Sequence, residues 1–154
     1  MKEMLEIRGG VAILCHERVR CKHLDDYDVN GLEAIWAEVM INSVRFVIGS
    51  VYIPPYKDDD LKRFQLVLKR VMKDHKKVLV CMDANSRNAV WDNSCIGLDP
   101  NVRSMKRGEH LLEMFEAAPV HIHNDGSTTF FGSRGISTPD ITVFAGIIES
   151  KPVS

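Results

Sequence analysis

Two neighbouring segments in the first half of the chain carry the clearest pattern of apolar positions. Residues 32–41 are apolar with two glutamates interspersed, and residues 44–53 are rich in Val, Ile, Phe and Tyr. The pattern predicts a strand for each, although the composition of the first also allows a helix. Asn42 and Ser43 form a short turn between them, and Pro54 ends the second strand because proline cannot donate to a sheet ladder. The sequence therefore predicts an antiparallel hairpin.

Two later segments show helical spacing. Asp58, Asp59 and Asp60 open the first, where negative charge is favourable, and its apolar residues recur at helical spacing through about Asp74. The second predicted helix covers 108–118. Shorter apolar runs predict further strands, at 10–16, 78–82, 120–123, 128–131 and 141–144.

The order of these elements indicates the fold class. Strands come first, followed by a helix, a strand, a helix and more strands, which is typical of an α+β protein with helices outside its sheets. The length of 154 residues suits one domain, so we expect residues 1–154 to form a single domain, and 45% apolar residues can supply its core. The last ten residues show no clear element.

Composition excludes several classes of protein. The net charge of −1 argues against a polybasic arm that grips nucleic acid by charge alone. The longest apolar run is about half of the roughly 20 residues that a membrane helix needs, and the N-terminus does not resemble a signal peptide. Four cysteines without paired spacing predict reduced thiols in an intracellular protein, with Cys15 and Cys81 on buried strands and no structural zinc site.

Four polar side chains fall at predicted strand ends, where the active sites of layered folds gather. Asp83 follows an apolar strand, and Asn85 comes two residues later, so strand alternation predicts that both point the same way. Tyr52 lies near the end of the earlier strand, and Asp140 leads into the last one. Such a set can hold a water, a metal ion or a phosphate oxygen. Each residue also has a purely structural interpretation, as a turn, cap or core residue.

These residues belong to a set of motifs that resembles the endonuclease/exonuclease/phosphatase superfamily, and most nearly the endonuclease domain of non-LTR (LINE-like) retrotransposons. The resemblance covers about residues 8–146 and depends on five pieces in the same order. They are GGVAIL from residue 9, VYIPP from residue 51, VLVCMDAN from residue 78, NDGSTTF from residue 124 and STPDIT from residue 137.

The resemblance implies a DNase I-like α/β/β/α sandwich of four layers and a phosphodiester hydrolase that uses Mg²⁺ or Mn²⁺. Asp83 would position the attacking water and is the candidate metal ligand. Asn85 and Tyr52 would hydrogen-bond the scissile phosphate, and Asp140 would orient a histidine. The implied partner is DNA, with no membrane, and the implied location is the nucleus if the element is active.

Three departures from the family pattern predict an incomplete domain. The Asn and the metal-binding Glu that the family has upstream are not matched by Glu3 or Glu6, and no Asp or His follows Asp140 to form a Ser-Asp-His motif. Met82 stands where the family usually has Gly, and Ser86, Arg87 and Asn88 follow in place of a common His. We therefore expect a fragment, cut at both ends, with impaired activity.

Two alternatives stay open. One is a non-catalytic remnant or binding domain that keeps the fold, and the other is a phosphoesterase of small or lipid phosphates. The histidines at 121 and 123 are interpreted as ordinary strand residues, and Trp36 and Trp91 as core. Four basic residues are interpreted as solvated surface or as contacts to DNA phosphate: Arg103, Lys106, Arg107 and Arg134.

Overall fold

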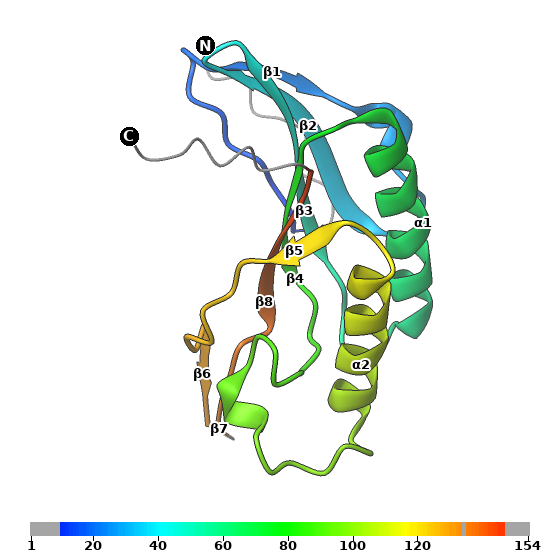
Figure 1. Cartoon of the computed structure of the whole chain (residues 1–154), viewed down its shortest axis with the longest axis vertical. Helices are drawn as coiled ribbons and strands as arrows, with labels where there is room; N and C mark the ends of the chain where they lie inside the picture. The colour runs from blue at the N-terminus through cyan, green and yellow to red at the C-terminus, as the bar shows by residue number, and fades with distance from the viewer. Residues whose placement is uncertain (1–9, 134, 147–154) are drawn as a thin grey trace.

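The computed structural model describes residues 10–133 and 135–146. A six-stranded mixed sheet dominates the fold, and both helices lie on one side of it (Figure 1). The strand order is β1-β2-β3-β4-β8-β5, in which only β3 and β4 pair in parallel. The sheet strands are β1 Arg20–His23, β2 Glu33–Ile41, β3 Val44–Tyr52, β4 Val78–Asp83, β5 Val120–Ile122 and β8 Asp140–Ala145. The helices are α1 Asp58–Asp74 and α2 Arg103–Glu116, with short 3₁₀ turns at Asp25–Tyr27 and Asn93–Cys95.

The predicted early hairpin is confirmed. Strands β2 and β3 pair antiparallel along their whole length, with Ile41 opposite Val44. Asn42 and Ser43 form the turn with positive φ values of 48° and 63°, which are the angles that a tight two-residue hairpin requires. Strand β2 is buried on both faces through most of its length. This double burial explains why its apolar residues do not alternate cleanly and why its composition also allows a helix.

The α+β class is also confirmed, because the core lies between the sheet and the two helices. Alternate residues of β3, β4 and β8 point toward the helices, where they are buried. Phe64 of α1 and Phe115 of α2 pack into the same cluster. Of the four expected layers, the described residues supply one large sheet and one helix layer.

The predicted strand at 10–16 is wrong. Only Val11 makes a bridge there, and Leu14 is 83% exposed. The edge position beside β2 is taken instead by β1, which starts at Arg20. An apolar run predicts a strand only where a neighbouring strand is free to pair with it, and the sequence does not show which neighbour is free.

The prediction that two cysteines lie on buried strands is wrong as well. Cys81 is exposed, because it lies on the face of β4 that points away from the helices. Cys15 is half-buried and lies outside any strand. The buried cysteine is Cys95, in the 3₁₀ turn after Trp91.

The irregular segment between β4 and α2 is held by buried groups. Trp91 is fully buried, as predicted, and its indole N–H donates to the carbonyl oxygen of Ser86 at 3.4 Å. Asp92 is also fully buried and accepts hydrogen bonds from Arg87 and Ser94. Burial raises the pKa of Asp92, but the bonds from Ser94 and Arg87 outweigh burial and hold this pKa below its ordinary value.

A second, two-stranded sheet stands apart from the main one. Strands β6 Phe130–Gly132 and β7 Gly135–Ser137 pair antiparallel with each other and extend beyond the lower end of the sheet (Figure 1). The sequence predicted the first of them, at 128–131, but not the second. Arg134 lies outside the described residues, as do Glu3, Glu6 and residues 147–154.

We expect Gly49→Ala to destabilise the fold by about 1–3 kcal/mol, because an added methyl group overfills a packed core. The new Cβ would lie 2.5 Å from Cζ3 of Trp36, a side chain with no exposed surface. Urea unfolding followed by circular dichroism measures the loss. Ser50→Ala, on the opposite face of the same strand, is the control, and equal stability of the two variants would contradict this account of the core.

Candidate functional site

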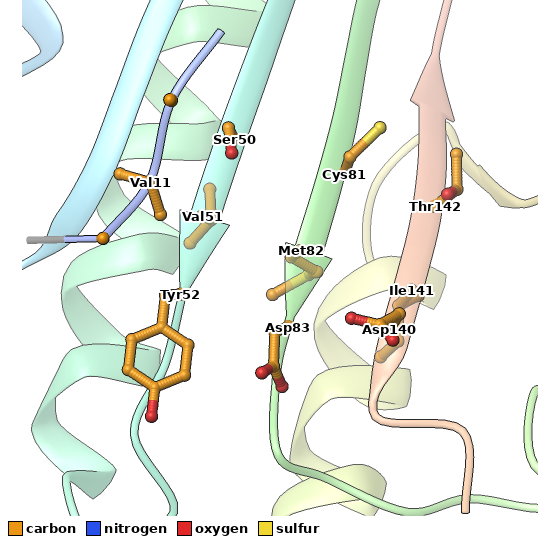
Figure 2. A pocket seen from close by; sticks show the side chains of 12 residues that line it. Val11, Ser50, Val51, Tyr52, Cys81, Met82, Asp83, Asp140, Ile141 and Thr142 are labelled. Atoms are coloured by element: carbon orange, nitrogen blue, oxygen red, sulfur yellow. The ribbon is translucent and has the colours of Figure 1, made fainter. Parts of the chain in front are cut away.

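Three of the four predicted site residues lie in a row on adjacent strands. Tyr52 ends β3 and pairs in register with Asp83 at the end of β4, and Asp83 pairs with Asp140 at the start of β8. Residues paired in register project to the same side of a sheet. Figure 2 shows the Tyr52 and Asp83 side chains next to each other, with Asp140 on the neighbouring strand. The pairing thus gathers residues that are far apart in the sequence.

A groove with a volume of about 560 Å³ follows this row up the sheet face opposite the helices. Ser50, Cys81 and Thr142 line its floor beyond the row, one from each strand (Figure 2). Val11 and its neighbours form one side. The groove is therefore polar and acidic at the strand ends and mixed in character further along the strands.

Asn85 joins the site by a different route from the one predicted. Strand β4 ends at Asp83, so strand alternation does not extend to Asn85, whose φ of 46° is left-handed. Its backbone N–H donates to Oδ1 of Asp83 at 3.2 Å, and its side-chain Nδ2 donates to the carbonyl oxygen of Ile53 at 3.2 Å. The structural alternative, a strand-end turn that caps itself, therefore describes the local geometry.

Neighbouring elements hold the backbone of this turn from several sides. The N–H of Ala84 donates to the carbonyl oxygen of Pro139 at 3.0 Å, which ties the turn to the start of β8. The N–H of Ile53 donates to the carbonyl oxygen of Asp83 at 2.8 Å, which ties it to the end of β3. Bonds of this kind fix the direction of Asp83 and Asn85 more firmly than a free surface loop would.

The electrostatics of the row favour retained protons on Asp83 and Tyr52. Burial raises the pKa of Asp83, the Asn85 N–H lowers it, and the negative charge of Asp140 raises it, with a net upward shift. Burial, and then the charge of Asp83, raises the pKa of Tyr52. The phenol therefore stays protonated at neutral pH and is available as a hydrogen-bond donor. Two adjacent carboxylates also concentrate negative charge that a bound cation would relieve.

The donor set suits a hard divalent cation. Asp83 and Asp140 supply carboxylate oxygens from neighbouring strands, and Mg²⁺ is commonly held by one or two carboxylates together with waters and substrate phosphates. Within residues 10–133 and 135–146, no group of three or more His, Cys, Asp or Glu side chains is placed to hold a metal ion. In the same ranges, no histidine hydrogen-bonds the Asp140 carboxylate. The backbone carbonyl oxygen of Asp140 accepts a hydrogen bond from the side chain of Asn124.

The sequence does not predict the position of Arg107, which is interpreted above as solvated surface or as a contact to DNA phosphate. The residue is 4% exposed, and its guanidinium binds the carboxylate of Asp58 and the carbonyl oxygen of Ala84. The sequence contains one sign that this part of α2 is buried: Arg107 is followed by Gly108, and a glycine in a helix can mark a close approach of another backbone. A Cβ at Gly108 would lie 1.9 Å from the carbonyl oxygen of Arg87, so the first half of α2 packs directly against the segment that follows Asn85.

Comparison with known proteins identifies the family. A sequence model described as endonuclease-reverse transcriptase matches residues 46–151, well over half of the chain. The chain belongs to the endonuclease–reverse transcriptase family. The matched residues, 46–151, include the whole row of Tyr52, Asp83 and Asp140. The resemblance drawn from the sequence motifs is thereby confirmed.

A solved structure shows the same fold. The endonuclease domain of TRAS1, a telomere-specific non-LTR retrotransposon, superposes with a TM-score of 0.70 at 19% sequence identity. The match covers 93% of this chain and 65% of that domain, so the chain spans about two thirds of the length of the solved domain. The DNase I-like fold, here in partial form, is thereby confirmed. No curated protein sequence matches this chain.

The helices give one further negative result. In the parts of the chain that the structure describes, neither α1 nor α2 is long and apolar enough to cross a membrane.

We expect Asp83→Asn to stabilise the fold at pH 7. The raised pKa means that folding penalises the charged form of the Asp83 carboxylate. The protonated Asp83 therefore contributes its full stability below the ordinary Asp pKa of about 4, and this contribution is lost as the pH rises through the raised pKa of the folded protein. A neutral amide of the same shape avoids that penalty and can still accept the Asn85 N–H bond. Urea midpoints at pH 7 and near pH 4 measure the difference, which should shrink at the lower pH. Equal or lower stability of the variant at pH 7 would contradict this electrostatic account.

Proposed function

We propose that this chain is an endonuclease domain that nicks DNA by metal-dependent hydrolysis of a phosphodiester bond, as part of a non-LTR retrotransposon. Two findings support the proposal: membership of the endonuclease–reverse transcriptase family and a fold shared with the TRAS1 endonuclease domain. The single observation that carries it is the row of Tyr52, Asp83 and Asp140, which opens onto a groove at the strand ends. A domain of an active element would work in the nucleus, where its DNA target lies.

The carboxylates have separate tasks in this proposal. Asp83 is half-buried and bonded to the Asn85 N–H, so one of its oxygens stays fixed while the other faces the groove and can orient a water for in-line attack. Asp140 is exposed and stands beside it. Together they would hold Mg²⁺ or Mn²⁺, which when bound neutralises phosphate charge and stabilises the leaving oxygen.

The remaining two residues act on the phosphate. The Tyr52 hydroxyl keeps its proton at neutral pH and can donate a hydrogen bond to a non-bridging phosphate oxygen. The Asn85 amide nitrogen carries two hydrogens, of which one is used by the carbonyl oxygen of Ile53. The second is free to donate to the same phosphate. The Tyr52 hydroxyl and the Asn85 amide are both uncharged, so they would stabilise the negative charge that develops on the phosphate by hydrogen bonding alone.

A plasmid-nicking assay tests the proposal. With Mg²⁺, the purified chain should convert supercoiled DNA to the open circle, and EDTA should abolish this. Asp83→Asn should lower the rate by at least about 10²-fold, and Tyr52→Phe or Asn85→Ala by about 10–10²-fold, because each removes a group that acts in the transition state. Asp59→Asn is the matched control, since this carboxylate is 78% exposed on α1 and away from the row.

Three outcomes would count against the proposal. Nicking that persists in Asp83→Asn would indicate a contaminating nuclease or a different site. A folded chain that binds DNA without nicking it would favour the binding-domain alternative. Hydrolysis of small phosphate esters by a chain that leaves DNA intact would favour the phosphoesterase alternative.

A further inference from the structure

Arg107 is the one buried arginine among the residues that the structure describes, and it sits behind the proposed catalytic turn. Nη1 donates to the carboxylate of Asp58 at 2.9 Å, and Nη2 donates to the carbonyl oxygen of Ala84 at 3.2 Å. Ala84 is the residue between Asp83 and Asn85. A charged side chain from α2 thus reaches the backbone of the turn from the helix side of the sheet, opposite the groove.

The geometry of a peptide unit connects that contact to the groove. The bond between Ala84 and Asn85 is trans and planar, so its C=O and N–H groups point in opposite directions. The carbonyl oxygen accepts from Arg107, and the N–H of Asn85 donates to Oδ1 of Asp83. A bond that holds the oxygen on the helix side therefore holds the hydrogen on the side of Asp83.

This peptide unit also has a reason to flip. Asn85 is held at a φ of 46°, a left-handed conformation that costs energy for a residue other than glycine. Rotation of the peptide unit would relieve the strain and turn the N–H away from Asp83. The Ser86 hydroxyl also donates to the carbonyl oxygen of Ala84, at 2.9 Å, but it belongs to the same turn and can move with it. Arg107 comes from a separate element and makes a charge-assisted bond.

We propose that Arg107 is a positioning residue that locks the Ala84–Asn85 peptide in the orientation that presents its N–H to Asp83. The importance of that orientation for cleavage rests on the function proposed above, but the orientation itself does not. The simpler role would be structural, with Arg107 serving only to pair with Asp58 and join the two helices.

Arg103 provides the matched control for that simpler role. It binds the same carboxylate, with Nη2 2.8 Å from Oδ2 of Asp58, but its side chain is 55% exposed and its second bond goes to the carbonyl oxygen of Tyr56. Arg103→Met therefore removes one arginine–Asp58 bond without touching Ala84. Arg107→Met removes the other arginine–Asp58 bond and the bond to Ala84 together.

Amide hydrogen exchange, measured by NMR at a single pH, reads the turn directly. In Arg107→Met we expect exchange of the Asn85 amide to accelerate by at least about tenfold, because its bond to Asp83 breaks when the peptide rotates. Two neighbouring amides serve as internal references: the N–H of Ala84, bonded to Pro139, and the N–H of Arg87, bonded to Ser104 at 2.9 Å. Both should change by less than about threefold, and Arg103→Met should leave all three unchanged.

Kinetics on plasmid DNA give the second readout. Arg107→Met should lower kcat by about 10–10²-fold and change KM by less than about threefold, because a misdirected Asp83 impairs the chemical step while the DNA-facing surface is intact. If the unaltered chain does not cut DNA but the exchange result holds, the proposed function fails and the assignment of Arg107 as a positioning residue stands.

Two exchange results would overturn the assignment. Equal acceleration of all three amides would show that Arg107 only packs the helix against the turn, and an unchanged Asn85 amide would show that the peptide does not need it. If Arg107→Met does not fold, Arg107→Lys takes its place. A single ammonium group cannot reach both partners, and the carboxylate of Asp58 is the stronger one, so the bond to Ala84 is lost while the charge is kept. An unchanged Asn85 amide in that variant would equally overturn the assignment.

Discussion

The site depends on the register of one strand. β4 lies between β3, which runs parallel to it, and β8, which runs antiparallel. Parallel pairing brings the ends of β3 and β4 to the same edge, and antiparallel pairing brings the start of β8 to that edge as well. A slip of one residue in either pairing would turn one of the three site side chains toward the helices and into the core. The apolar residues beneath the site therefore fix the register, because the same slip would expose them to water.

The two faces of the sheet have different roles: one packs against the helices in the core, and the other carries the candidate site. On the helix face of β3, β4 and β8 the residues from Val47 onward are buried, whereas the other face is only partly buried and carries both apolar and polar side chains. The turn after β4 crosses between them. The Asp83 side chain lines the groove, whereas the Ala84 side chain is buried in the core and the Ala84 carbonyl oxygen accepts a hydrogen bond from Arg107 of α2. The contact from Arg107 thus reaches the site through the backbone of this turn.

Much of this could be predicted from the sequence, for identifiable reasons. The hairpin of β2 and β3 followed from apolar runs and a turn signal, and Tyr52, Asp83 and Asp140 could be placed at strand ends by the same local reasoning. What could not be predicted depends on partners distant in the sequence. The run at 10–16 has strand composition but no free neighbour, β1 has little apolar pattern, and Arg107 looks like any basic residue on a helix. Asn85 reaches Asp83 through a left-handed turn, which strand periodicity does not describe.

The position of β8 has a consequence for how the molecule forms. It comes last in the described sequence, yet it lies inside the sheet, between β4 and β5. During synthesis the hairpin, α1 and β4 can associate while one edge of β4 is still unpaired, and that edge closes only when residues 140–145 arrive. Contacts between segments so far apart in the sequence form slowly. The acidic row is consequently among the last features to assemble, so a nuclease centre would arise only once the rest of the fold is in place.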